Sequence, residues 1–93
     1  MMSHTRTEKH KLLTRIRRVR GQLEAVERTV EMDADCAAVL QQVTACRGAL
    51  DALVAEVVEH HIRKHVVDPD APRNDPHVQA AEQLVEIVHS YLT

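Results

Sequence analysis

The sequence predicts an all-α protein with three helices in a single domain covering residues 1–93. Two observations lead to this prediction. Apolar residues recur at intervals of three and four along most of the chain, and no stretch alternates as a half-buried strand does. All three prolines lie in the segment 68–76, and a short acidic segment, MDAD, occupies residues 32–35. These two breaks divide the chain into three helical segments.

The first helix is expected from about residue 8 to 31, after a polar and mobile arm at residues 1–7. Its apolar residues repeat with the spacing 4-3-4-3-4, which is the heptad seam of a helix that packs on a second helix. The seam consists of Leu12, Ile16, Val19, Leu23, Val26 and Val30.

The second helix is expected at residues 35–67, with Asp33 or Asp35 as its N-cap. Cys46 falls on its apolar stripe, where packing in the core is the expected role. The third helix is expected at residues 76–92, with Asp75 as N-cap and Pro76 as first residue. Its inward-facing residues are predicted to be Val78, Ala81, Leu84, Val85, Val88, Tyr91 and Leu92.

The composition indicates a subunit that completes its core by association. Aromatic residues make up 1% of the chain, from Tyr91 alone, so the core has to be built from aliphatic side chains. A short chain with strong apolar stripes and few large side chains buries little surface by itself. We therefore expect an oligomer.

Charge is divided unevenly along the chain. The segment 6–20 carries a net charge of +6 and the remainder −8. In the first helix Lys11, Arg15 and Arg18 share one face by their spacing, with Arg17 and Arg20 beside them. Arginine binds phosphate bidentately, so this face suits a nucleic-acid backbone, although a solvated basic surface has the same composition. No helix-turn-helix or zinc-finger pattern is present, and we expect binding through phosphates and groove shape.

Cys36, His61 and His65 are candidate metal ligands. The two histidines are four residues apart, which places both imidazoles on one face of a helix. Cys36 precedes His61 by 25 residues, or about 37 Å of straight helix, so one helix cannot bring all three side chains to one ion. Either they are unrelated, or a second copy runs antiparallel and places its Cys36 beside the histidine pair.

His4, on the predicted arm, could supply a further ligand. One thiolate with two or three imidazoles suits Ni(II), Co(II) or Zn(II), whereas Cu(I) prefers at least two sulfurs. His60 points about 100° from His61 and is expected to face solvent or to support the ligands. No signal peptide or membrane span is recognised, and two cysteines without such a signal indicate a reducing cytoplasm.

Three segments resemble the CsoR/RcnR family of small helical transcriptional repressors, and the resemblance covers nearly the whole chain. They are SHTRTEKHKLLTRIRRVRGQLEAVER, DCAAVLQQVTACRGALDALVAEVVEHHI and the terminal SYLT. The resemblance implies an antiparallel four-helix-bundle dimer that assembles into a disc-like dimer of dimers. It also implies that the apo-tetramer binds operator DNA and that an effector releases it. Of the basic residues, Arg15, Arg17 and Arg18 are those it implies as DNA contacts.

Within the family, the nickel- and cobalt-sensing branch uses an N-terminal histidine, the cysteine and two downstream histidines. His4, Cys36, His61 and His65 match this pattern, which implies a repressor of a metal efflux gene that responds to Ni(II) or Co(II). Copper sensors have a second cysteine where this chain has His65, which argues against Cu(I).

The alternative within the family is a formaldehyde-responsive repressor in which Cys36 is the nucleophile. That branch has a proline as its second residue, whereas this chain has none before Pro69. Its RIRRVRGQLEAVER segment is nonetheless similar to that branch. An enzyme is not expected, because no carboxylate stands in an HExxH-like relation to the histidines, as a zinc hydrolase requires. A plain helical adaptor would leave the basic segment and the ligand pattern as coincidences.

Overall fold

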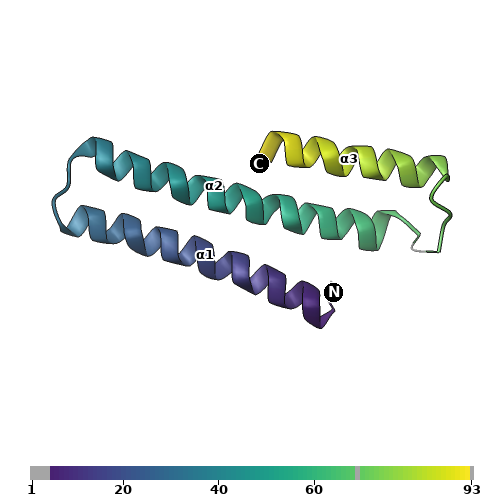
Figure 1. The fold of residues 1–93 in the computed structure, drawn as a ribbon, viewed down its shortest axis with the longest axis horizontal. Coiled ribbons are helices and arrows are strands. Elements are labelled where there is room, and N and C mark those ends of the chain that lie inside the picture. Colours follow the sequence, from purple (N-terminus) through teal and green to yellow (C-terminus); the bar gives the residue numbers. More distant parts are fainter. Residues whose placement is uncertain (1–4, 69, 93) are drawn as a thin grey trace. The chain divides into compact units, whose positions relative to one another are not determined.

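The computed structural model describes residues 5–68 and 70–92, which form three α-helices and one short π-helix (Figure 1). The helices are α1 (Arg6–Glu31), α2 (Cys36–His61), the π-helix η1 (Ile62–Val66) and α3 (Pro76–Leu92). No strand occurs among these residues. The predicted all-α subunit of three helices is therefore confirmed. The chain divides into two compact units, one ending at Leu53 and one beginning at Val54.

A capping box begins α1. The Thr5 hydroxyl accepts a hydrogen bond from the Glu8 N–H, and the Glu8 carboxylate accepts one from the Thr5 N–H, both at 3.1 Å. These reciprocal bonds satisfy two backbone donors that a helix start otherwise leaves unpaired. They explain why α1 begins at Arg6, two residues before the predicted start and inside the segment that the sequence assigned to the arm.

The turn between α1 and α2 closes on a residue in the left-handed conformation. Asp33 has φ 55°, its N–H donates to the Val30 carbonyl at 3.0 Å, and the Ala34 N–H donates to the Thr29 carbonyl at 3.2 Å. These two bonds form the Schellman pattern that ends many helices, usually with glycine at the left-handed position. Asp35 then caps α2, because its side chain accepts from the Ala38 N–H at 2.9 Å. Of the two predicted N-caps, Asp35 has this role.

Within the first unit, α1 and the beginning of α2 form a helical hairpin (Figure 1). No residue of α1 is buried, and alternate members of the predicted seam face solvent. Ile16, Leu23 and Val30 are 45%, 59% and 56% exposed, whereas Leu12, Val19 and Val26 are half-buried. The seam is thus only partly covered in the single chain.

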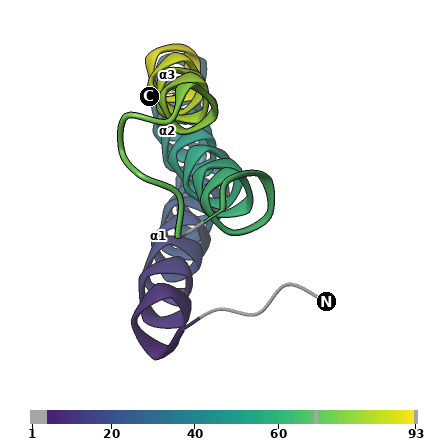
Figure 2. The ribbon, with the colours of Figure 1, turned by 90° about the vertical axis from the view of Figure 1, so that its right-hand side faces the viewer.

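The second unit has the small core of the chain. Ile62 of η1 is buried against Ala81 and Val85 of α3, with Val58 and Val67 packed around them. In this unit α3 lies alongside the end of α2 (Figures 1 and 2). Asp75 caps α3 as predicted, since its side chain accepts from the His77 N–H at 2.8 Å.

Two expectations for the second unit need correction. The second helix does not continue as an α-helix to residue 67: from Ile62 it widens to a π-helix, whose last bond runs from the Val67 N–H to the Ile62 carbonyl at 3.2 Å. On α3, Leu84 and Tyr91 do not face inward and are 45% and 86% exposed. They lie outside the narrow face that reaches Ile62.

Replacing Asp33 by glycine is expected to stabilise the protein by about 0.5–1 kcal/mol. A left-handed conformation costs an L-residue about 1–2 kcal/mol, and the greater freedom of glycine in the unfolded chain offsets part of that gain. Urea denaturation of wild type and Asp33→Gly at equal protein concentration measures the difference.

The control is Asp35→Ala, which removes the N-cap of α2 and should lower stability by about 1 kcal/mol. A midpoint for Asp33→Gly at or below that of wild type would show that the turn does not have the conformation described.

Candidate functional site

The histidine pair lies at the junction of α2 and η1. His61 is the last residue of α2 and His65 the fourth residue of η1. Their ring centroids are 4.9 Å apart with an angle of 34° between the planes, and both residues are exposed. The two imidazoles therefore lie side by side, as the spacing predicted. Two neighbouring imidazoles at the surface can act as a chelating pair for a borderline metal ion.

Cys36 is the first residue of α2, with an exposed free thiol. It begins the same 26-residue helix that His61 ends. Over residues 5–68 and 70–92, no group of three or more His, Cys, Asp or Glu side chains is placed to hold a metal ion. One subunit thus brings together His61 and His65 but not Cys36. The remaining candidate, His4, lies outside the described residues.

His60 does not face solvent. Its side chain is 12% exposed and its Nε2 lies 3.3 Å from Glu56 Oε1, one turn earlier on α2. This contact fixes the imidazole against its own helix, so His60 is the less accessible of the neighbouring histidines. Cys46 is a free, half-buried thiol on α2, in keeping with the packing role predicted for it.

An ionic network that was not predicted from the sequence connects η1 with α2 and α3. Arg63 of η1 donates to the carboxylates of both Glu59 and Glu82. Its Nε and one terminal nitrogen each lie 3.2 Å from Glu59 Oε1, and the guanidinium contacts both oxygens of Glu82. His89 Nε2 lies 3.2 Å from the other Glu59 oxygen. The Glu59–Arg63 spacing of four residues was a visible signal, but the α3 partners have no local signature.

The contacts of this network shift the pKa values of Glu59 and Arg63. Partial burial alone would raise the pKa of Glu59, but the hydrogen bonds from His89 and Arg63 outweigh it and the pKa is lowered below its ordinary value of 4.5. The hydrogen bond to Glu82 is the main cause of a raised pKa for Arg63, which keeps the guanidinium charged. The network is therefore ionic at neutral pH.

The basic residues predicted to contact DNA all lie on α1. Lys11, Arg17, Arg18 and Arg20 are exposed, and Arg15 is half-buried. The exposed guanidinium groups of Arg17 and Arg18 are accessible to a polyanion. The structure contains no nucleic acid, and the assignment of these five residues stays a prediction.

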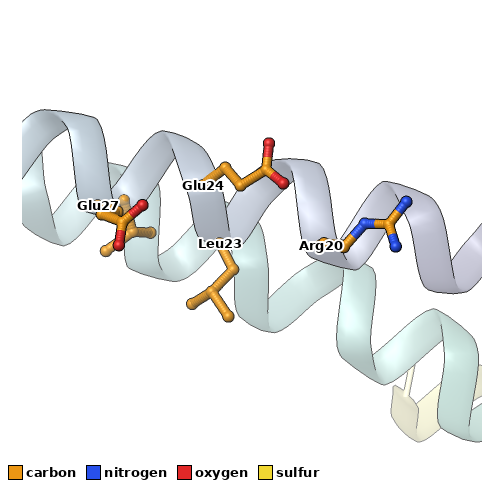
Figure 3. Close-up of a pocket in the computed structure, with 5 residues that line it drawn as sticks. Arg20, Leu23, Glu24 and Glu27 are labelled. Carbon is orange, nitrogen blue, oxygen red and sulfur yellow. The ribbon is translucent and has the colours of Figure 1, made fainter.

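Arg20 stands at the edge of this basic surface. With Leu23, Glu24, Val26 and Glu27 it lines a shallow pocket on α1 (Figure 3). Two carboxylates share that pocket with a single guanidinium, so the local charge is negative rather than positive. Arg20 is consequently the least suited of the five to a phosphate contact.

Known proteins match this chain over almost its whole length. The profile of a family described as metal-sensitive transcriptional repressor matches residues 8–90. The transcriptional repressor RcnR of Citrobacter koseri is 36% identical over 93 residues, covering 98% of this chain and 99% of that protein. An uncharacterized protein from the bioA 5′ region of Serratia marcescens is 46% identical over 91 residues, with 98% and 99% covered.

Among solved structures, a variant of the formaldehyde-responsive regulator FrmR from Salmonella enterica serovar Typhimurium superposes with a TM-score of 0.68. It is 34% identical, and the match covers 98% of this chain and 100% of that chain. The fold and the basic first helix fit the class of small helical DNA-binding regulators. The chain belongs to the metal-sensitive transcriptional repressors, the family that includes RcnR and FrmR. Its members are oligomeric DNA-binding repressors and not enzymes.

In the described part of the chain, none of the helices combines the length and the apolar character needed to cross a bilayer.

The lowered pKa of Glu59 predicts a pH-dependent contribution to stability. A carboxylate with a lowered folded-state pKa stabilises the fold above its unfolded value of about 4.5 and loses that contribution as the pH falls through the folded value. Glu59→Gln should therefore be less stable than wild type at pH 7, and the difference should shrink below about pH 4.5. Urea midpoints of both proteins between pH 3 and 7, run in about half-unit steps, test this.

The matched control is Glu86→Gln, which neutralises an exposed carboxylate elsewhere on α3. A stability difference for Glu59→Gln that stays constant across the pH range would contradict the ionic role of this carboxylate.

Proposed function

We propose that this repressor senses Ni(II) or Co(II) in the cytoplasm. The apo-protein binds operator DNA, and metal binding releases it and derepresses a metal efflux gene. The observation that carries the proposal is the pairing of the His61 and His65 rings, exposed and 4.9 Å apart. A site rich in imidazole nitrogen favours these ions over Cu(I), while Zn(II) has compatible ligand chemistry.

The proposed ligands are His4, Cys36, His61 and His65. The thiolate comes from a second copy of the chain, because Cys36 and His61 are the two ends of one helix. His4 completes the set from the segment that precedes α1. These donors agree with those implied by the resemblance to the nickel- and cobalt-sensing branch.

A dimer of antiparallel subunits, assembled into a tetramer, accounts for the apolar surface of the single chain. On α2, exposed apolar residues follow a coiled-coil spacing, which indicates a second helical partner. They are Leu40, Val43, Leu50, Val54 and Val57. Together with the exposed seam residues of α1, these residues can form the core of a four-helix bundle between two copies of the chain.

The DNA surface is proposed to consist of Arg17 and Arg18 with Arg15, and with Lys11 and Arg20 at its edges. Metal binding between two subunits would change the spacing of their α1 helices relative to the phosphate backbone. Coupling of this kind is typically about 1–3 kcal/mol, which changes the affinity for operator DNA by about 5- to 150-fold.

A formaldehyde-responsive repressor is the second candidate, and the exposure of the Cys36 thiol is the observation that favours it. In that case the thiol would add to the aldehyde carbonyl. Identity does not separate the two candidates, since the RcnR and FrmR relatives are 36% and 34% identical. The neighbouring imidazoles have no role in the aldehyde reaction as written, which is why the metal is preferred.

Substituting His65 by alanine should abolish release of DNA by Ni(II) and Co(II) and leave the affinity of the apo-protein within about twofold. The imidazole contributes to the metal site and lies outside the basic face of α1. Fluorescence anisotropy with the DNA upstream of the repressor's own gene measures both properties, with Ni(II), Co(II), Zn(II) and formaldehyde titrated separately.

Cys36→Ala distinguishes the candidates in the same assay. If metal ions no longer release DNA from either Cys36→Ala or His65→Ala, the result supports a metal sensor. Release by formaldehyde alone, lost in Cys36→Ala and retained in His65→Ala, would replace it with the aldehyde sensor.

Arg18→Ala should weaken operator binding and reduce the slope of log affinity against log salt by about 1, because one phosphate contact and its released counterion are lost. The matched control is Arg28→Ala, in the last turn of the same helix and outside the basic segment. Binding isotherms between about 50 and 200 mM salt give the slopes. An unchanged slope for Arg18→Ala would remove Arg18 from the DNA surface.

A further inference from the structure

The π-helix η1 holds His65 in a conformation that the sequence around it does not dictate. A π-helical turn is rare and weaker than an α-helical one, and it persists where tertiary contacts favour it. Residues 62–66 contain no proline or glycine, so the local sequence permits the α-helix to continue through His65. The contacts that favour the wider turn therefore have to come from outside the segment.

Most of these contacts come from α3. On one side of η1 the buried Ile62 packs on Ala81 and Val85. At its end the His77 Nε2 lies 3.1 Å from the Val66 carbonyl oxygen, which the helix itself leaves without a partner. A further contact is ionic: Arg63, between the two histidines in sequence, binds both carboxylate oxygens of Glu82.

Arg63 also ties η1 back to α2. Its guanidinium binds the Glu59 carboxylate, which in turn lies 3.2 Å from His89 Nε2 on α3. One planar side chain thus connects the last turn of α2, η1 and α3. A planar guanidinium group donates its hydrogen bonds in fixed directions, so it fixes the orientation of its partners as well as their distance. A lysine ammonium group fixes only the distance.

We propose that Arg63 is a positioning residue for the His61–His65 pair, and that the Arg63–Glu82 contact makes docking of α3 a determinant of metal affinity. This rests on the proposed function in so far as the pair binds metal. Without the ionic contact, the turn at residues 62–66 opens more easily, and the two imidazoles lose their fixed separation. Groups that orient metal ligands from outside the coordination sphere typically change affinity 10- to 100-fold.

The proposal has a readout that needs no metal. The bond from the Val67 N–H to the Ile62 carbonyl closes η1 and is broken when this turn opens. In the apo-protein, amide hydrogen exchange at Val67 should become at least about threefold faster in Glu82→Gln, because local opening of this turn becomes easier. Arg63→Lys, which keeps the charge and loses the planar guanidinium group, should fall between wild type and Glu82→Gln.

The second readout is Ni(II) affinity by competition with a chromophoric chelator, together with the absorption spectrum of the Co(II) form. Glu82→Gln should bind Ni(II) roughly tenfold more weakly and give a shifted Co(II) spectrum. Glu86→Gln is the matched control, since Glu86 is one turn further along α3, is exposed and lines the same groove as Glu82. It removes the same charge without touching Arg63.

The proposal would be overturned if Glu82→Gln had the Val67 exchange rate and the Ni(II) affinity of wild type. It would also be overturned if Glu86→Gln changed both quantities as much as Glu82→Gln does. If wild type binds neither Ni(II) nor Co(II), the proposed function fails, whereas the Val67 exchange rates still decide whether Arg63 holds η1.

Discussion

The length of α2 is the constraint on which the proposed site depends. Cys36 begins a helix of 26 residues and His61 ends it, which separates them by about 37 Å of regular helix. Metal–ligand bonds are about 2.0–2.3 Å long, so a shared ion requires a second copy of the chain in the opposite direction. The same pairing produces two equivalent sites, and it makes effector binding sensitive to how two subunits pack. In the proposed function, a ligand that bridges two subunits shifts their α1 helices and thereby controls DNA binding.

The distribution of buried surface is consistent with this dependence on a partner. Among the described residues the buried apolar side chains are Ala55, Ile62, Ala81 and Val85, and three of these lie in the small core between η1 and α3. Elsewhere the apolar seams of α1 and α2 are half-covered, so their packing energy is available to association rather than to the isolated chain. The α3 helix packs on η1, which contains His65, while the exposed seams of the long helices are available for the proposed contacts between copies.

Much of the fold follows from local rules that the sequence displays. The heptad spacing and the clustered prolines predicted three helices, and Asp35 and Asp75 were recognisable as caps. The start of α1 at Arg6 depends on a capping box whose Thr5 was assigned to a mobile arm, although the Thr-x-x-Glu pattern was present. The π-helical turn could not be predicted, because it depends on Arg63, Glu82 and Ile62 meeting across 19 or more residues of sequence. The histidine pairing was predictable from spacing alone, whereas the position of Cys36 relative to it depends on a second chain.

The most direct test of the shared site mixes two defective subunits. Cys36→Ala and His65→Ala proteins each lack part of every site as homodimers. In a mixed antiparallel dimer, however, the intact Cys36 of one chain meets the intact histidine pair of the other. The two variants are titrated with Co(II), first separately and then after they have been unfolded and refolded together. The thiolate–Co(II) absorption band reports binding. The account predicts no band for either variant alone and one restored site in each mixed dimer. Absence of the band in the refolded mixture, with wild type showing it, would contradict a site built between two chains.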